Sequence, residues 1–200
     1  MAAPTREHIL TAAARLYAEH GFRGTTTRAI AEKAGVNEVT VFRIFGSKET
    51  LIVEAMRAHG VPVNVGTLPA TPVDPEQELA AWAIQTRKVL VSIRAMIRQA
   101  MSDAEQNPEM PRSVTRGAEA MFDTIHQYLE RLRDAGFVPE AAETQVAGGI
   151  LVSALFHDAM WREFMPQHFS PVATAPASYA RLCLKSIGFN PAVREQRVAS

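Results

Sequence analysis

The chain has 200 residues, of which 47% are hydrophobic and 21% charged, with one cysteine, Cys183. This composition is typical of globular proteins and excludes disordered and collagen-like chains, while a lone cysteine excludes an internal disulfide or a multi-cysteine metal site. The formal net charge is zero, which argues against a nucleic-acid partner, because affinity for nucleic acids comes mainly from Lys and Arg at phosphates.

Hydrophobic periodicity predicts helices throughout, so the expected fold class is all-α. In the N-terminal region we expect helices over residues 5–20, 27–34, 38–45 and 48–58. Gly21 is placed to end the first of these helices. Thr26 and Asn37 are placed to cap the second and third.

Residues 60–75 contain four prolines and two glycines and predict a linker. After it we expect helices over residues 75–103, 112–135, 139–164 and 175–187, with a short extra helix before residue 112. No apolar stretch is long enough to span a membrane, and the N-terminus lacks a basic and then apolar secretion signal. We therefore expect a cytoplasmic protein, with no metal, cofactor or membrane partner.

The helices at 27–34 and 38–45 carry the pattern of a helix-turn-helix. Two helices that cross steeply need a small residue at the crossing, a turn residue that tolerates positive φ, and an apolar residue pointing back. Ala31, Gly35 and Val41 occupy these three places. An ordinary helical hairpin shows the same pattern, so these residues alone leave both interpretations open.

A longer run, residues 9–51, resembles the N-terminal domain of the TetR family of bacterial transcription regulators. The matching features are the two alanines and the leucine of the first helix, Gly21-Phe22, Thr25-Thr26, Ile30-Ala31, Ala34-Gly35-Val36, Phe42, Phe45 and Ser47-Lys48-Glu49 before Leu51. The resemblance implies a three-helix helix-turn-helix domain, joined by a linking helix to a C-terminal helical bundle that dimerises. It implies a DNA-binding regulator, by family habit a repressor, and not an enzyme.

The resemblance also implies the DNA contacts, which we expect from Thr26, Thr27, Arg28, Asn37, Glu38, Thr40, Phe42, Arg43 and Lys48. Thr26 and Lys48 are expected at phosphates, and Thr40 and Arg43 at base edges. Glu38 either accepts a hydrogen bond from cytosine or only interacts favourably with the dipole at the N-terminus of its helix. The alternative for each side chain is an ordinary solvated surface position.

Two positions depart from the family pattern. Phe42 stands where the family usually has tyrosine, and Ile44 where it often has histidine. We therefore expect Phe42 to act through packing or contact with a thymine methyl group, and Ile44 to join the core.

The expected domains are residues 1–58 for DNA binding, a linker over 59–75, a domain for effector binding and dimerisation over 76–190, and a frayed tail over 191–200. We expect a homodimer through the helices near 139–164 and 175–187, where small residues such as Ala147, Gly148 and Gly149 permit close helix approach. The alternative is that these residues pack within one chain. A two-fold dimer implies a roughly palindromic operator of double-stranded DNA.

A small hydrophobic effector is expected from the resemblance. Its candidate contacts are Trp82, Gln85, Thr86, Val89, Ile93, Met96, Met121, Phe122, Ile125, Tyr128 and His157. Aromatic and methionine side chains at helical spacing are also typical of a plain core. Two rival functions remain at this point, a helical-bundle enzyme and a helical interaction protein without specific DNA binding.

Overall fold

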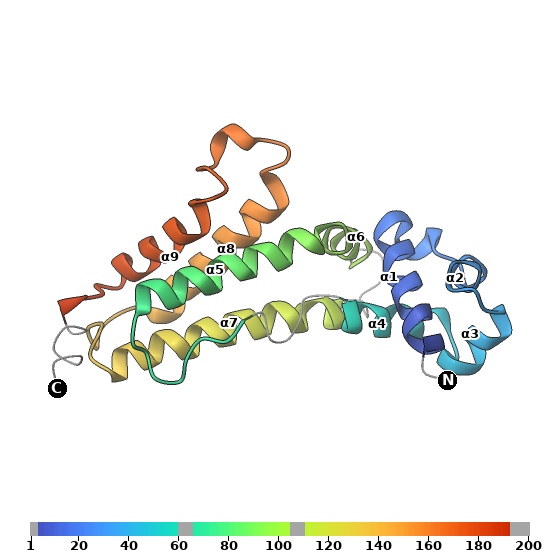
Figure 1. The fold of residues 1–200 in the computed structure, drawn as a ribbon, viewed down its shortest axis with the longest axis horizontal. Helices are drawn as coiled ribbons and strands as arrows, with labels where there is room; N and C mark the ends of the chain where they lie inside the picture. Colours follow the sequence, from blue (N-terminus) through green and yellow to red (C-terminus); the bar gives the residue numbers. More distant parts are fainter. Residues whose placement is uncertain (1–3, 60–65, 105–110, 193–200) are drawn as a thin grey trace. The chain divides into compact units, whose positions relative to one another are not determined.

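The computed structural model describes residues 4–59, 66–104 and 111–192. Within these ranges it contains helices and no strand, which confirms the all-α prediction (Figure 1). The helices are α1 (Pro4–Gly24), α2 (Thr27–Ala34), α3 (Glu38–Phe45), α4 (Lys48–His59), α5 (Pro75–Ser92), α6 (Arg94–Ala104), α7 (Pro111–Asp134), α8 (Thr144–Trp161) and α9 (Ala175–Ser186), with a 3₁₀ turn at Pro166–His168.

The chain forms two compact units, residues 1–62 with 93–118 and residues 63–92 with 119–200. This division differs from the predicted one because α6 packs against α1 in the first unit. In that unit α1 also packs against α2 and α4. The side chains at its centre are fully buried and include Ile9, Tyr17, Ile30, Leu51 and Ile52.

Gly21 ends the regular part of α1, as predicted. Its backbone has φ 68° and ψ −176°, a region that is essentially restricted to glycine. The amide and hydroxyl of Thr25 donate to the Gly21 carbonyl at 3.1 and 2.7 Å. A Cβ at this position would lie 2.3 Å from Nε2 of Gln99 in α6, so Gly21 also permits the close approach of α6.

The prediction of one helix over residues 75–103 is wrong, because the chain leaves the helix at Ile93 between α5 and α6. Immediately before the break, the hydroxyl of Ser92 donates to the carbonyl of Val89 at 2.7 Å. Serine bonds of this kind compete with the helical ladder. The sequence contains no proline or glycine here that would have signalled the break.

The predicted helix over 139–164 is shorter in the structure, where α8 begins at Thr144 and ends at Trp161. Before α8, the amide of Ala142 donates to Pro139 at 3.0 Å, and the amide of Thr144 donates to Ala142 at 2.9 Å. These bonds form turns, so residues 139–143 do not join the helix.

In the second unit, α8 packs against both α5 and α9, and these three helices lie together in Figure 1. On its other side α8 approaches α7, since a Cβ at Gly148 would lie 3.3 Å from Ile125 and 3.5 Å from Leu129. Gly148 and Ala147 are therefore buried within one chain. For Ala147 and Gly148 this matches the alternative of packing within one chain, whereas Gly149 is half-buried.

Several predicted segments lie partly or wholly outside the described residues: 60–65 of the linker, 105–110 before α7, where the short extra helix was expected, and 193–200 of the tail. The described part of the linker, up to α5, has neither helix nor strand. None of the described helices is long and apolar enough to cross a bilayer. The described residues contain no group of three or more His, Cys, Asp or Glu side chains arranged to hold a metal.

Candidate nucleic-acid interface

Two helix caps and a glycine turn, all predicted from the sequence, define the α2–α3 segment. The side chain of Thr26 accepts from the amide of Ala29 at 3.1 Å and begins α2. Asn37 accepts from the amide of Val39 at 2.9 Å and begins α3. Between them Gly35 has φ 68° and ψ 33°. A Cβ on Gly35 would meet nothing within 4 Å, so the turn requires glycine for its φ and not for space.

The crossing of the two helices is packed as predicted. Ala31 of α2 and Val41 of α3 are both buried, together with Ile30 and Phe45. Ile44 is half-buried and packs against the same core, which agrees with its expected role. The opposite face of α3 is consequently left for solvent or a partner.

Several predicted DNA contacts are exposed. Arg28 of α2 and Phe42 and Arg43 of α3 are all exposed. Neither guanidinium has an ion pair within the part of the chain that the structure describes. Thr26 is also exposed, and its hydroxyl accepts from Ala29 while its own proton remains available for a phosphate oxygen.

Glu38 and Thr27 are joined to each other. The hydroxyl of Thr27 donates to the carboxylate of Glu38 at 2.6 Å, and both side chains are half-buried. This bond ties the first residue of α2 to the first residue of α3. It occupies one carboxylate oxygen of Glu38, which favours a positioning role over acceptance from cytosine. Thr40 is half-buried on the flank of the exposed face.

Lys48 lies at the first turn of α4, next to the chain segment that follows the kink in α1. Its ammonium stands 4.2 Å from the centre of the Phe22 ring, a distance at which cation–π attraction operates. Ser47 begins the helix by accepting from the amide of Thr50 at 3.1 Å. Lys48 is therefore held in place at a helix N-terminus, where phosphates are favoured.

One exposed residue was missed by the sequence analysis. Val39 is 71% exposed on the outer face of α3, where a polar side chain would be expected. It lies three positions before Phe42 and therefore on the same side of the helix. The spacing from Phe42 is the sequence signal for this position, although valine carries no hydrogen-bonding group.

The comparisons with known proteins agree with this geometry. A family model described as bacterial regulatory proteins, tetR family, matches residues 9–55. The HTH-type transcriptional regulator YvkB of Bacillus subtilis is 29% identical over 76% of this chain and 80% of its own length. The HTH-type transcriptional repressor AcnR of Corynebacterium glutamicum is 27% identical over 69% of this chain and 82% of its own.

The chain belongs to the TetR family. The fold extends the match beyond the first domain, because SmeT of Stenotrophomonas maltophilia, solved in complex with triclosan, superposes with a TM-score of 0.75. That alignment covers 94% of this chain and 93% of SmeT at 23% identity. The protein is a DNA-binding transcriptional regulator, and membership of this regulator family removes both the enzyme and the non-DNA-binding alternatives.

The predicted effector contacts of this TetR-family protein divide between the two units. Ile93 and Met96 belong to the first unit, and Met96 packs in its core. The others belong to the second unit, where Trp82, Thr86, Met121, Ile125 and Tyr128 are buried, Val89 is half-buried, and Gln85, Phe122 and His157 are exposed. The structure therefore brings only part of the predicted set into one core.

Two polar atoms in that core are unusual. Nε1 of Trp82 and Oγ1 of Thr86, one turn apart on α5, are buried without a hydrogen-bond partner in the described residues. The hydroxyl of Tyr128, in contrast, donates to Glu78 at 2.6 Å. Buried polar groups normally have a hydrogen-bond partner. Trp82 and Thr86 therefore mark a site in the core where such a partner is missing.

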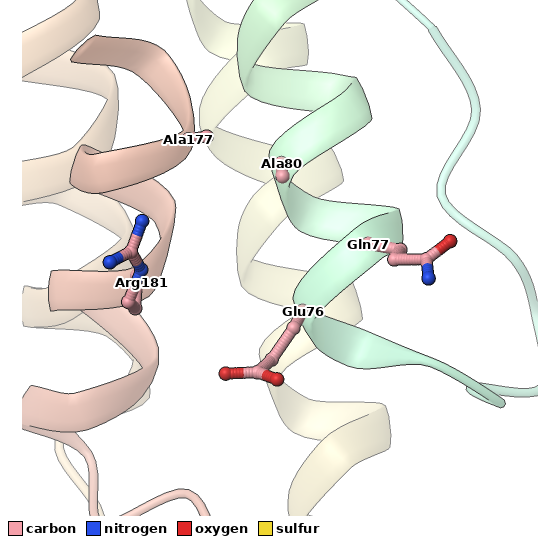
Figure 2. Close-up of a pocket in the computed structure, with 5 residues that line it drawn as sticks. All are labelled: Glu76, Gln77, Ala80, Ala177 and Arg181. Atoms are coloured by element: carbon pink, nitrogen blue, oxygen red, sulfur yellow. The ribbon is translucent and has the colours of Figure 1, made fainter. Parts of the chain in front are cut away.

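A separate shallow groove lies between α5 and α9 (Figure 2). Its volume is about 230 Å³, and none of the predicted effector contacts lines it. Glu76 and Arg181 flank the groove with opposite charges, while Gln77 points away from it. The groove is open to solvent and therefore differs from the enclosed apolar pocket that a hydrophobic effector requires.

Proposed function

We propose that this regulator is a dimeric repressor that binds a roughly palindromic operator and leaves it when a small, largely hydrophobic effector binds. The DNA-binding part of this proposal is supported by the exposed face of α3 and the capped N-terminus of α2. Residues 1–58 supply the DNA-binding part and residues 76–190 the effector and dimer parts. Since it would act on DNA, we propose a cytoplasmic location.

The proposed contacts divide by chemistry. Thr26, Arg28 and Lys48 bind phosphates, which positions the protein without reading sequence. Arg43 and Thr40 contact base edges, because arginine can bond guanine with two hydrogen bonds and threonine can pack its methyl group on thymine. Thr27 and Asn37 act through the helix ends that they stabilise.

The first test is selection of bound sites from random DNA, followed by affinity measurements on the selected operator. We expect an inverted repeat and, for Arg43→Ala, a loss of about 5- to 100-fold in affinity, with relaxed preference at one base pair. Arg181→Ala, an exposed arginine of the second unit, is the matched control and should bind normally. Absence of any enriched site would refute the proposal.

Dimerisation is supported by apolar side chains on the outer side of α8 and α9. Val146, Ile150 and Trp161 lie along one side of α8 and are exposed, and Leu182 of the neighbouring helix α9 is exposed as well. Exposed apolar patches of this kind mark interaction surfaces. The proposed interface therefore uses the two predicted helices, without Ala147 and Gly148, which are buried within the chain.

Effector binding is supported by the two unpartnered atoms on α5. A ligand with an apolar body and one polar group would fill an apolar site while accepting from Trp82 or pairing with Thr86. SmeT, which shares the fold, is recorded with triclosan, a ligand of that character. Bound there, the ligand would adjoin α5, which leads through Ile93 into α6 and thus to α1. Release of DNA requires that the ligand prefer a conformation that mismatches the operator.

Thr86→Val tests the unpartnered hydroxyl directly. Valine has nearly the same shape, so removal of an unsatisfied buried hydroxyl is expected to raise the free energy of unfolding by about 1 kcal/mol in urea titrations. Thr144→Val is the matched control. The hydroxyl of Thr144 is buried but bonded to Arg133 and Glu130, so this variant should lose stability. A loss of equal size at both positions would show that Thr86 is satisfied.

A further inference from the structure

A second groove lies on the first unit, between α1 and the C-terminal end of α2, and has a volume of about 210 Å³. The four lining residues from α1 are three or four positions apart along the chain or adjacent, so they share one side of that helix. None of the DNA or effector contacts predicted from the sequence lines this groove. Its lining residues are His8, Thr11, Ala12 and Arg15 of α1 and Lys33 and Ala34 of α2.

The charges at this groove have one sign. Arg15 and Lys33 reach it from different helices, and no Asp or Glu is among the six described residues that line it. The guanidinium of Arg15 has neither an ion pair nor a hydrogen bond within the ranges that the structure describes. The ammonium of Lys33 lies 3.9 Å from Oε1 of Glu19, but these side chains are 37% and 53% exposed, so water and salt screen the pair. The groove therefore keeps an excess of positive charge.

This excess is local, because the whole chain contains 21 basic and 21 acidic residues. Like charges gathered at one place repel each other, and an anion bound between them removes that repulsion. The planar fork of arginine matches two oxygens of a phosphate, and lysine adds a point charge. A phosphate monoester carries a charge of about −1.5 to −2 at neutral pH, which balances the two cations. Thr11 and His8 add hydrogen-bonding groups beside them.

We propose that this groove is a second ligand site, which binds a small phosphate monoester. Arg15 of α1 and Lys33 of α2 bind the phosphate oxygens, so the bound molecule joins the two helices. The volume is below the range of about 300–1,000 Å³ for drug-sized ligands, which restricts the organic part to a few atoms. The site differs from the one proposed for a hydrophobic effector, because it lies in the first unit and no aromatic side chain except the His8 ring lines it. It requires neither a dimer nor an operator and therefore does not rest on the proposed function.

The test uses glycerol 3-phosphate, a phosphate monoester with a small uncharged body. It is titrated into the full chain without DNA at constant ionic strength, and the backbone amide NMR signals are followed. We expect saturable shifts around Arg15 and Lys33 with a Kd of about 1 mM. Glycerol, which lacks the phosphate, should cause no shift at these amides. Arg15→Gln and Lys33→Gln should each raise the Kd about tenfold, the effect of losing one charge-assisted contact. Both side chains are exposed, so the variants keep the core intact.

Arg57→Gln is the matched control, because Arg57 is an exposed arginine of α4 in the same unit but outside the groove. It should retain the wild-type Kd. The proposal is overturned if glycerol 3-phosphate causes no saturable shift, or if Arg57→Gln weakens binding as much as Arg15→Gln does. It is also overturned if Arg15→Gln and Lys33→Gln leave the glycerol 3-phosphate titration unchanged and instead weaken operator binding, since the groove would then hold the DNA backbone.

Discussion

Asp158→Asn is expected to lower the free energy of unfolding by about 3–5 kcal/mol, the cost of removing one partner from a buried ion pair. Asp158 is fully buried in α8. Its carboxylate accepts hydrogen bonds from Arg87 of α5, from Arg162 directly after the end of α8, and from Tyr179 of α9. Both guanidinium groups are themselves largely buried. The variant would leave two cations in the core of the second unit without an anion.

The pH dependence of stability gives this prediction a second readout. Burial raises the pKa of Asp158, but hydrogen bonds from Arg162, Arg87 and Tyr179 outweigh it and hold the pKa below the ordinary value of 3.8. A carboxylate with a depressed pKa stabilises the fold above its unfolded pKa, and this stabilisation is lost as pH falls through the folded pKa. The difference in free energy of unfolding between the wild type and Asp158→Asn should therefore be constant near pH 7 and shrink below about pH 4.

Urea titrations at pH 7 and at pH 3.5 measure both effects. Asp123→Asn is the matched control, because Asp123 is exposed on α7. This substitution should change the free energy of unfolding by no more than about 0.5 kcal/mol. An Asp158→Asn variant as stable as the wild type at pH 7 would show that the buried cations find other partners. The cluster would then have no role in holding α5, α8 and α9 together.

The helix-turn-helix could be predicted because local rules determine it. A hydroxyl or amide before each helix and a glycine at positive φ are properties of short segments, and Thr26, Asn37 and Gly35 behave in the structure as those rules require. The same holds for Gly21, whose position predicted the end of the regular helix. Its contact with Gln99 could not be predicted, because it depends on α6, which is distant in sequence.

The features that were missed depend on packing between distant segments. Nothing near Asp158 in the sequence points to Arg87, which lies 71 residues away. Gly148 could have faced a second subunit or α7 with equal local plausibility, and only the position of Ile125 distinguishes the two. Exposure is a non-local property for the same reason, and Val39 was therefore missed although its helix was predicted correctly.

Ile150→Glu is expected to convert the proposed dimer into a monomer. Ile150 is 64% exposed in the middle of the apolar side of α8, so a single chain tolerates the glutamate, whereas an isologous interface would bury two copies of it near the two-fold axis. Sedimentation equilibrium would show the change in mass. Ile84→Glu introduces the same charge at an exposed isoleucine of α5 and should leave the dimer intact.

The consequence for DNA binding follows from linkage between the two half-sites. A dimer binds its second half-site at high effective concentration, so the monomeric variant should lose about 10²- to 10⁴-fold in affinity for the full operator. Its affinity for an isolated half-site should equal that of the wild type, because α3 and its flanking charges are unchanged. A wild-type protein that is monomeric while bound to one half-site would refute the proposed dimer. An Ile150→Glu variant that remains dimeric would show that the interface lies away from Ile150. Equal losses on the half-site and the full operator would instead show that the glutamate had damaged the DNA-binding unit itself.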